Sequence, residues 1–141
     1  MTSYSALSPV SAGVFAALNV AGLTALVPGG ICDDVAQATG YPFVLFDVSE
    51  TSTGGFGTKP GDGQLPMVDL RVHVFSIFQG YSEAQHVMDK VLQLLADPPA
   101  VTGYSSWAIF HDETVALGDS VIAGVKVKEL VALCRLYVEA P

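Results

Sequence analysis

Charged side chains are scarce in this sequence. Only 14% of its 141 residues are Asp, Glu, Lys or Arg, and 50% are hydrophobic. An average soluble domain has roughly 25% charged residues. A chain with so little charge leaves apolar surface that other protein must cover, because large exposed apolar patches promote association. The composition therefore predicts contacts with further copies of the chain or with a partner; the alternative is a core rich in Ala and Val.

Basic residues are especially few. The chain has 6 Lys and Arg against 14 Asp and Glu, which gives a formal net charge of −8. Proteins that bind nucleic acid carry a positive surface that neutralises phosphates. The charge balance therefore argues against nucleic-acid binding. It remains compatible with a surface past which DNA slides without sticking.

The first part of the chain has no charge at all. No charged residue precedes Asp33, no Lys or Arg precedes Lys59, and residues 10–27 are nearly all apolar or small. A signal peptide needs a positive segment before its apolar run, which is missing here. The run is also marginal in length for a membrane span. We predict a buried helix instead, whose apolar face holds Val10, Val14, Ala17, Leu18 and Ala21.

The rest of the chain alternates between strand and helix patterns. Residues 31–35, 41–48 and 67–78 have strand character, and residues 82–97 form an amphipathic helix with a capping box at Ser82 and Gln85. Further strands are expected at 104–111, 115–117 and 125–138, the last with a bulge near Lys128 and Glu129. This order predicts one α+β domain over residues 1–141. It has a mainly antiparallel or mixed sheet of about four to five strands, with two helices packed on one face.

A glycine-rich stretch, "GGFGTKPGDG" at residues 54–63, resembles a phosphate-binding loop in composition. Phosphate loops follow a strand and open a helix, whose N-terminus supplies donors. Here a strand follows, and Pro60 removes one backbone donor. The better interpretation is a long connection between two paired strands, at about residues 50–64. Long loops in compact domains are usually functional or disordered.

No group of residues predicts catalysis, and we expect no catalytic, cofactor or metal site. His73, His86 and His111 lack metal-ligand spacing, and His111 with Asp112 could be half of a base and its orienting carboxylate, but without a nucleophile motif. An enzyme or small-ligand domain built on these two residues and the glycine-rich loop remains the alternative of a different class. Cys32 and Cys134 are expected to be small buried hydrophobes, with a disulfide between them left open.

Several segments in a fixed order resemble a known family. They are "YPFVLFD" at residues 41–47, "VDLRVHVFS" at 68–76 and "GYSEAQHVMDKVLQLL" at 80–95, with "GGICDDV" upstream at 29–35 and a strand at 125–138. In this order they resemble the tail-completion proteins of long-tailed phages and phage-like gene transfer agents. That family includes tail terminators related in fold to the one of phage lambda. The resemblance extends over roughly residues 7 to 138.

The resemblance implies a structural virion protein without enzymatic activity, cofactor or membrane. Members are expected to assemble in the host cytoplasm as a hexameric ring at the head-proximal end of the tail. The ring ends polymerisation of the tail tube and joins the tail to the head connector or neck protein. DNA passes through its lumen without specific binding. A neck or head-closure protein on the connector side is the closest alternative.

The loop at residues 50–64 is the candidate contact with the tail tube. Phe56 would serve as an apolar anchor and Lys59 as a charge contact, with Asp62 and Gln64 nearby. A loop that orders on docking carries an entropy cost, which delays association until the right partner is present.

Overall fold

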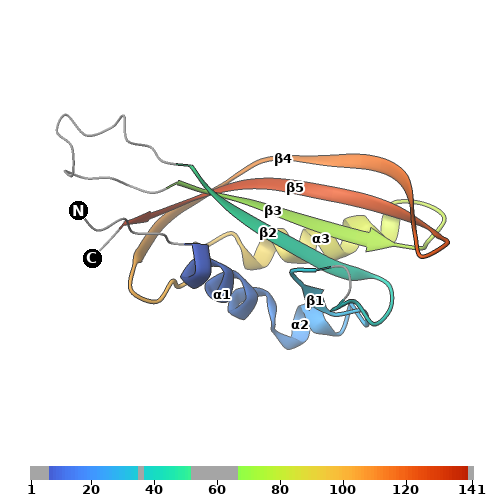
Figure 1. Ribbon diagram of the computed structural model, residues 1–141, viewed down its shortest axis with the longest axis horizontal. Helices are drawn as coiled ribbons and strands as arrows, with labels where there is room; N and C mark the ends of the chain where they lie inside the picture. Colours follow the sequence, from blue (N-terminus) through green and yellow to red (C-terminus); the bar gives the residue numbers. More distant parts are fainter. Residues whose placement is uncertain (1–6, 35–36, 52–66, 140–141) are drawn as a thin grey trace.

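The computed structural model describes residues 7–34, 37–51 and 67–139. They form the predicted α+β fold: a five-stranded sheet with helices on one face (Figure 1). We call the opposite side of the sheet the open face. The elements in chain order are α1 (Leu7–Leu18), α2 (Ala21–Thr24), β1 (Ile31–Cys32), β2 (Phe43–Thr51), β3 (Met67–Ser76), α3 (Ser82–Leu94), β4 (Ser105–Ile122) and β5 (Val125–Glu139).

The strand order across the sheet is β1-β2-β3-β5-β4. β1 is parallel to β2, and all other neighbours are antiparallel. The strand predicted at 67–78 is present as β3, and its side chains alternate: one set is fully buried under the helices and the other lies on the open face. The buried set is Val68, Leu70, Val72 and Val74. The main core therefore lies between the sheet and the helices. A second, smaller buried cluster of Phe43, Phe75 and Val127 lies on the open face, near the end of β3.

The predicted N-terminal helix is present but shorter than expected. α1 buries Val10, Val14 and Leu18, as its spacing indicates, and ends at Leu18. The chain bends at Val20 and then forms the short α2, whose buried residue is Leu23. Ala21 is exposed because it begins this second helix and no longer follows the stripe of the first. None of the helices in the described ranges is long and apolar enough to cross a membrane.

α3 confirms the predicted amphipathic helix, with its buried stripe of Ala84, Val87, Met88 and Val91 facing the sheet. The predicted capping box is wrong. The N-cap is Tyr81, and no side chain caps the helix. Glu83, in the first turn of α3, connects the helix to the sheet. The Glu83 carboxylate accepts a hydrogen bond from the Ser76 hydroxyl over 2.7 Å, which ties the end of β3 to the start of α3.

β4 differs most from expectation. The two short strands predicted at 104–111 and 115–117 are parts of one 18-residue strand. Its register against β5 shifts at three places. At each of them β4 has one extra residue without an opposed partner on β5: Trp107, Asp112 and Leu117. Such bulges break the alternation that identifies a strand in sequence. The bulge predicted within β5 is wrong, because the extra residue opposite that region is Leu117 of β4.

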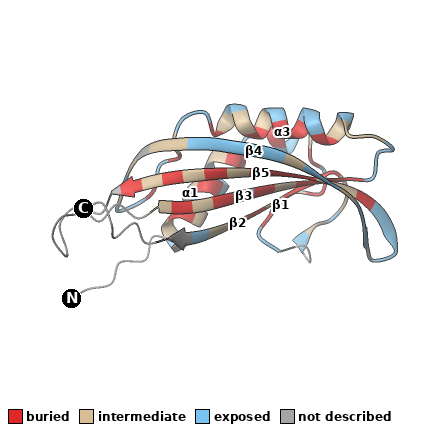
Figure 2. Cartoon of the chain, turned by 90° about the horizontal axis from the view of Figure 1, so that it is seen from above, coloured by how far each residue is buried: buried red, intermediate tan, exposed pale blue. Residues whose placement is uncertain are grey.

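The β4–β5 hairpin ends in a two-residue turn, Ala123–Gly124, with positive φ at both positions (51° and 80°). Turns of this kind match the twist of paired strands and suit glycine. The last β3 residue, Ser76, lies opposite Lys128, so the hairpin continues beyond the end of β3. Figure 2 shows exposed residues over much of β4 and buried residues along β3 and β5.

Candidate functional site

The residues proposed for catalysis do not act together. His111 Nε2 lies 2.7 Å from the hydroxyl oxygen of Thr114. Asp112, instead of orienting His111, accepts a hydrogen bond from Arg135 Nη2 over 3.0 Å. This hydrogen bond is the main cause that raises the pKa of the Arg135 guanidinium. Both His111 and Asp112 are exposed, so the hypothesis of a base with its orienting carboxylate loses its geometric support.

The two cysteines are free thiols and both are buried, so no disulfide joins them. Burial raises the pKa of Cys134 to about 11, with a further contribution from the charge of Asp112. Burial also raises the pKa of Cys32, and the carboxylates of Asp33 and Asp34 add to the effect. Thiols held in the protonated form are poor nucleophiles and poor metal ligands. Within the part of the chain that the structure describes, no three His, Cys, Asp or Glu residues are grouped to hold a metal ion.

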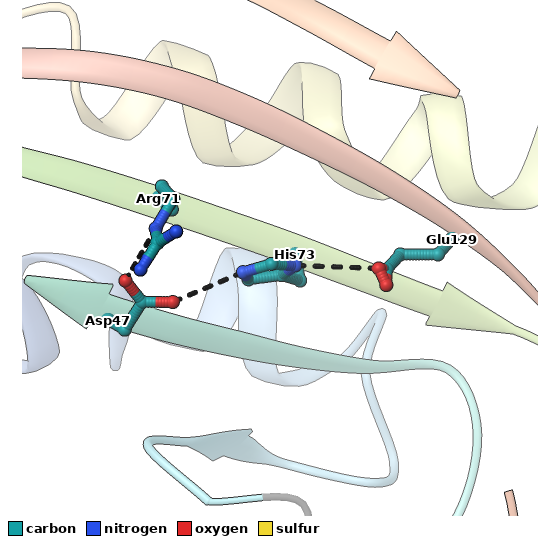
Figure 3. A network of polar contacts seen from close by, with 4 residues as sticks. All are labelled: Asp47, Arg71, His73 and Glu129. Carbon is teal, nitrogen blue, oxygen red and sulfur yellow. Dashed lines mark hydrogen bonds and ion pairs between the residues drawn. The ribbon is translucent and has the colours of Figure 1, made fainter. Parts of the chain in front are cut away.

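The open face carries a network of polar contacts in its centre (Figure 3). Asp47 of β2 pairs through Oδ1 with Arg71 Nε at 2.7 Å and through Oδ2 with His73 Nε2 at 3.2 Å. On its other side, His73 Nδ1 lies 3.6 Å from Glu129 Oε2 of β5. The network therefore links β2, β3 and β5. His73 therefore lies on the open face, between the carboxylates of Asp47 and Glu129.

Among the charged groups of this face, acidic ones are in the majority. Opposed residues of antiparallel strands share a face, which places Asp69 beside Arg135 and Glu113 beside Leu133. Among the described side chains, five carboxylates therefore meet two guanidinium groups and one histidine. The carboxylates are those of Asp47, Asp69, Asp112, Glu113 and Glu129.

A second surface is apolar and lies at the free end of the β4–β5 hairpin. Val121 and Val125 lie next to the turn on opposite faces of the hairpin, because Val121 is opposite Lys126 and Val125 is opposite Ile122. They are 70% and 41% exposed. Ile77 and Phe78 follow the end of β3 and are 53% and 52% exposed. We call these four residues the distal patch. Beside them, the Lys126 side chain is 77% exposed and lies 3.7 Å from Asp119.

A third feature is a hollow of about 320 Å³ between α1 and the β1–β2 edge. We call it the α1 hollow. Phe15, which is 42% exposed, stands in its wall. The residues around it include Ser11, Phe15, Ile31, Asp33, Gln37 and Phe46. It combines apolar walls with one exposed carboxylate, that of Asp33.

The interface candidates Phe56, Lys59, Asp62 and Gln64 lie outside the described residues. The prediction that their loop joins two paired strands is confirmed, because Thr51 at the end of β2 lies opposite Met67 at the start of β3. The sequence did not reveal the distal patch. Ile77 and Phe78 continue the apolar pattern of β3, and only the position of the strand end shows that they leave the sheet.

Two solved structures share the fold. A chain from the virion of a native gene transfer agent particle aligns over 98% of this chain and all of its own length, with a TM-score of 0.75 and 19% identity. The gp17 protein of bacteriophage SPP1 aligns over 94% of this chain and 90% of its own length, with a TM-score of 0.54 and 19% identity. No curated protein matches the sequence. At the level of sequence, the family described as Tail completion protein gp17 matches residues 12–121, well over half of the chain, so the chain belongs to this family of structural virion tail proteins.

Proposed function

We propose that the chain forms a hexameric ring at the head-proximal end of the virion tail. The ring ends polymerisation of the tail tube and joins the tail to the head, and DNA passes through its lumen. Membership of the tail-completion family gives the structural role in the tail. The ring, its position and its lumen are the content of the proposal, together with the absence of any catalytic step.

The observation that carries the proposal is the contrast between the two faces of the sheet. One face is covered by α1 and α3, and the open face presents five carboxylates against two guanidinium groups. A sheet of this kind can serve as a wall between packed protein and a water-filled channel. Carboxylates repel phosphates over about 10 Å at 0.1 M salt. DNA in such a channel stays mobile, which is what passage through a tail requires.

Partner contacts are proposed at the other end of the sheet. The loop that follows Thr51 leaves from the end of the sheet opposite the β4–β5 turn. Its residues Phe56, Lys59, Asp62 and Gln64 are proposed to contact the tail tube protein. The head connector or neck protein is then the partner on the opposite rim of the ring.

The first experiment measures the assembly state. Native mass spectrometry of the purified protein over a concentration series, alone and with tail tubes, is followed by electron microscopy of any large species. A hexamer with a central hole supports the ring. A stable dimer with no larger species in either condition contradicts it. Labelling the protein in tails made without heads then separates a tail terminator, which is present there, from a neck protein, which is absent.

The acidic lumen has its own test. Glu113→Lys changes the charge of the open face by two units per copy, and Asp89→Lys makes the same change on the exposed side of α3. Particles with the Glu113 variant should deliver DNA more slowly, most clearly at low salt, because a basic channel holds phosphates. Particles with the Asp89 variant should behave as wild type. Equal delivery by both variants contradicts an open face that lines the channel.

A further inference from the structure

The distal patch and the α1 hollow lie at opposite edges of the same sheet. The hairpin part of the patch, Val121 and Val125, belongs to the β4–β5 side, and the hollow borders β1 and β2 at the other end of the strand order. A contact between two different surfaces of identical subunits is head-to-tail, and repeated contacts of this kind close into a ring when the rotation permits. Two surfaces so placed are therefore the right pair to join neighbouring copies.

The distal patch has the properties of an inserting element. Its valines stand on a paired hairpin that extends past β3, so the backbone is fixed before any contact forms. Rigid elements lose little entropy on binding. Val121 is 70% exposed, and Ile77 and Phe78, which follow the end of β3, are 53% and 52% exposed. Apolar side chains gathered in this way mark an interaction surface.

The α1 hollow has matching chemistry. Phe15, Ile31 and Phe46 give it apolar walls, and its volume of about 320 Å³ can receive side chains from another molecule. Asp33 provides one carboxylate at its border. An apolar hollow with one charged group favours an apolar partner that carries the opposite charge.

The β4–β5 hairpin carries a positive charge that is suited to meet Asp33. Lys128 is held by Asp119 at 2.5 Å, and Arg71 and Arg135 are held by carboxylates at 2.7 Å and 2.9 Å. Lys126 is 77% exposed and 3.7 Å from Asp119, which makes its ion pair the longest of these four. Of these four cations it is therefore the most ready to take a new partner, and it stands opposite Val121 of the distal patch.

We propose that the distal patch of one copy docks into the α1 hollow of a second copy, with Lys126 of the hairpin facing Asp33 of the hollow. The proposal rests on the proposed ring and names the contact between its subunits. Burial of Val121, Val125, Ile77 and Phe78 supplies the apolar part of the contact. The charge pair fixes its orientation and register.

The first test is Val121→Asp, with Gln93→Asp as its control. Both positions are exposed, so both variants should fold as wild type, which circular dichroism checks. Both lower the net charge by one unit. A carboxylate forced into an apolar contact opposes binding, so Val121→Asp should raise the protein concentration needed for ring formation by about tenfold or more. Gln93→Asp should leave it unchanged.

The second test exchanges the charges. Lys126→Glu places like charges together and should weaken assembly, and adding Asp33→Lys in the same chain should restore it. Adding Asp89→Lys to Lys126→Glu gives the same net charge on the far side of α3 and should restore nothing. Rescue by Asp33→Lys alone identifies the pair, because a general charge effect would be rescued equally by both.

The outcomes separate this inference from the proposed function. If wild type forms rings and Val121→Asp forms them equally well, the docking is wrong and the ring stands. Equal rescue by Asp33→Lys and Asp89→Lys also overturns the docking. If wild type forms no ring, alone or on tail tubes, the proposed function and the docking both fail.

Discussion

The hydroxyl of Ser76 donates a hydrogen bond to the carboxylate of Glu83 over 2.7 Å. The same hydroxyl oxygen accepts a hydrogen bond from the backbone N–H of Phe78 over 3.1 Å. Ser76 is the last residue of β3 and is completely buried, and Glu83 lies in the first turn of α3. One side chain thus fixes the turn that displays Ile77 and Phe78 and joins the sheet to the helix.

Replacing Ser76 by Ala should lower the free energy of unfolding by about 1–3 kcal/mol, because it leaves the Phe78 N–H and the Glu83 carboxylate without their partner. Urea denaturation followed by circular dichroism measures the loss. Ser82→Ala is the control, since Ser82 is exposed and makes no capping hydrogen bond; its effect should stay within about 0.5 kcal/mol. Equal losses for the two variants contradict the special role of Ser76.

Gly29 is a position where one added carbon should lower the stability of the fold. A Cβ at Gly29 would collide with the carbonyl oxygen of Gly40, and the backbone of Gly29 is held by hydrogen bonds with Pro42 and Thr39, both at 3.1 Å. Gly29→Ala should therefore cost about 1–3 kcal/mol or more through overpacking. At Gly80 the added Cβ meets open space, so Gly80→Ala should be neutral or slightly stabilising. Thermal denaturation of both variants gives the comparison, and a neutral Gly29→Ala would falsify the close approach.

The buried thiol of Cys134 predicts a loss of stability at high pH. Burial raises its pKa from 9.0 to about 11, so the folded state favours the protonated thiol. The stability that this provides is fully present below pH 9 and is lost as the pH rises through about 11. The free energy of unfolding of wild type should fall more between pH 8 and pH 11 than that of Cys134→Ala, in which this thiol is absent.

The same thiol gives a chemical readout. A thiol-specific reagent at pH 8 should leave Cys134 of the folded protein unmodified and react with it in 6 M urea, because only the exposed thiolate is reactive. Mass spectrometry identifies the modified residue. Rapid modification of Cys134 without denaturant contradicts its burial.

The sequence predicted those elements whose pattern is local. β3 has strict alternation and α3 has a continuous apolar stripe, and both begin where expected, at Met67 and Ser82, and end two or three residues earlier than expected. The sequence pattern predicts two short strands in place of β4, because Asp112 and Leu117 are extra residues that shift the alternation of side chains. Only the pairing with β5 shows that the strand is continuous. The open-face network was equally hidden. Asp47 and Glu129 lie far from His73 in the chain and meet it only through strand register.

The distal patch shows a second reason why sequence falls short. Apolar residues in a strand pattern predict burial, and the strand predicted at 125–138 includes Val125, whereas Val121 lies between two predicted strands. They are exposed because the hairpin continues where β3 has ended, a difference in strand length that no local pattern records. The low charge of the chain indicated that such a surface exists, but not where it lies.

The loop between β2 and β3 allows a prediction about function that spares the fold. Thr51 and Met67 are opposed across the sheet, and residues 52–66 join them. Deleting Gly54 to Gly63 leaves residues 52, 53 and 64–66, and hairpins commonly close with about 2–5 residues. The shortened chain should therefore fold with a free energy of unfolding close to wild type.

If the loop contacts the tail tube, particles made with this deletion should have tails of uncontrolled length or tails that fail to join heads. Infectivity or gene transfer, together with electron microscopy of tail length, measures the outcome. Phe56→Ala and Lys59→Ala should each show part of the defect, because an apolar anchor and a charge contact contribute separately. Normal particles from the deletion variant would remove the loop from the proposed interface. Because the loop leaves from the far end of the sheet, its loss should not change ring formation, which the distal patch and the α1 hollow control.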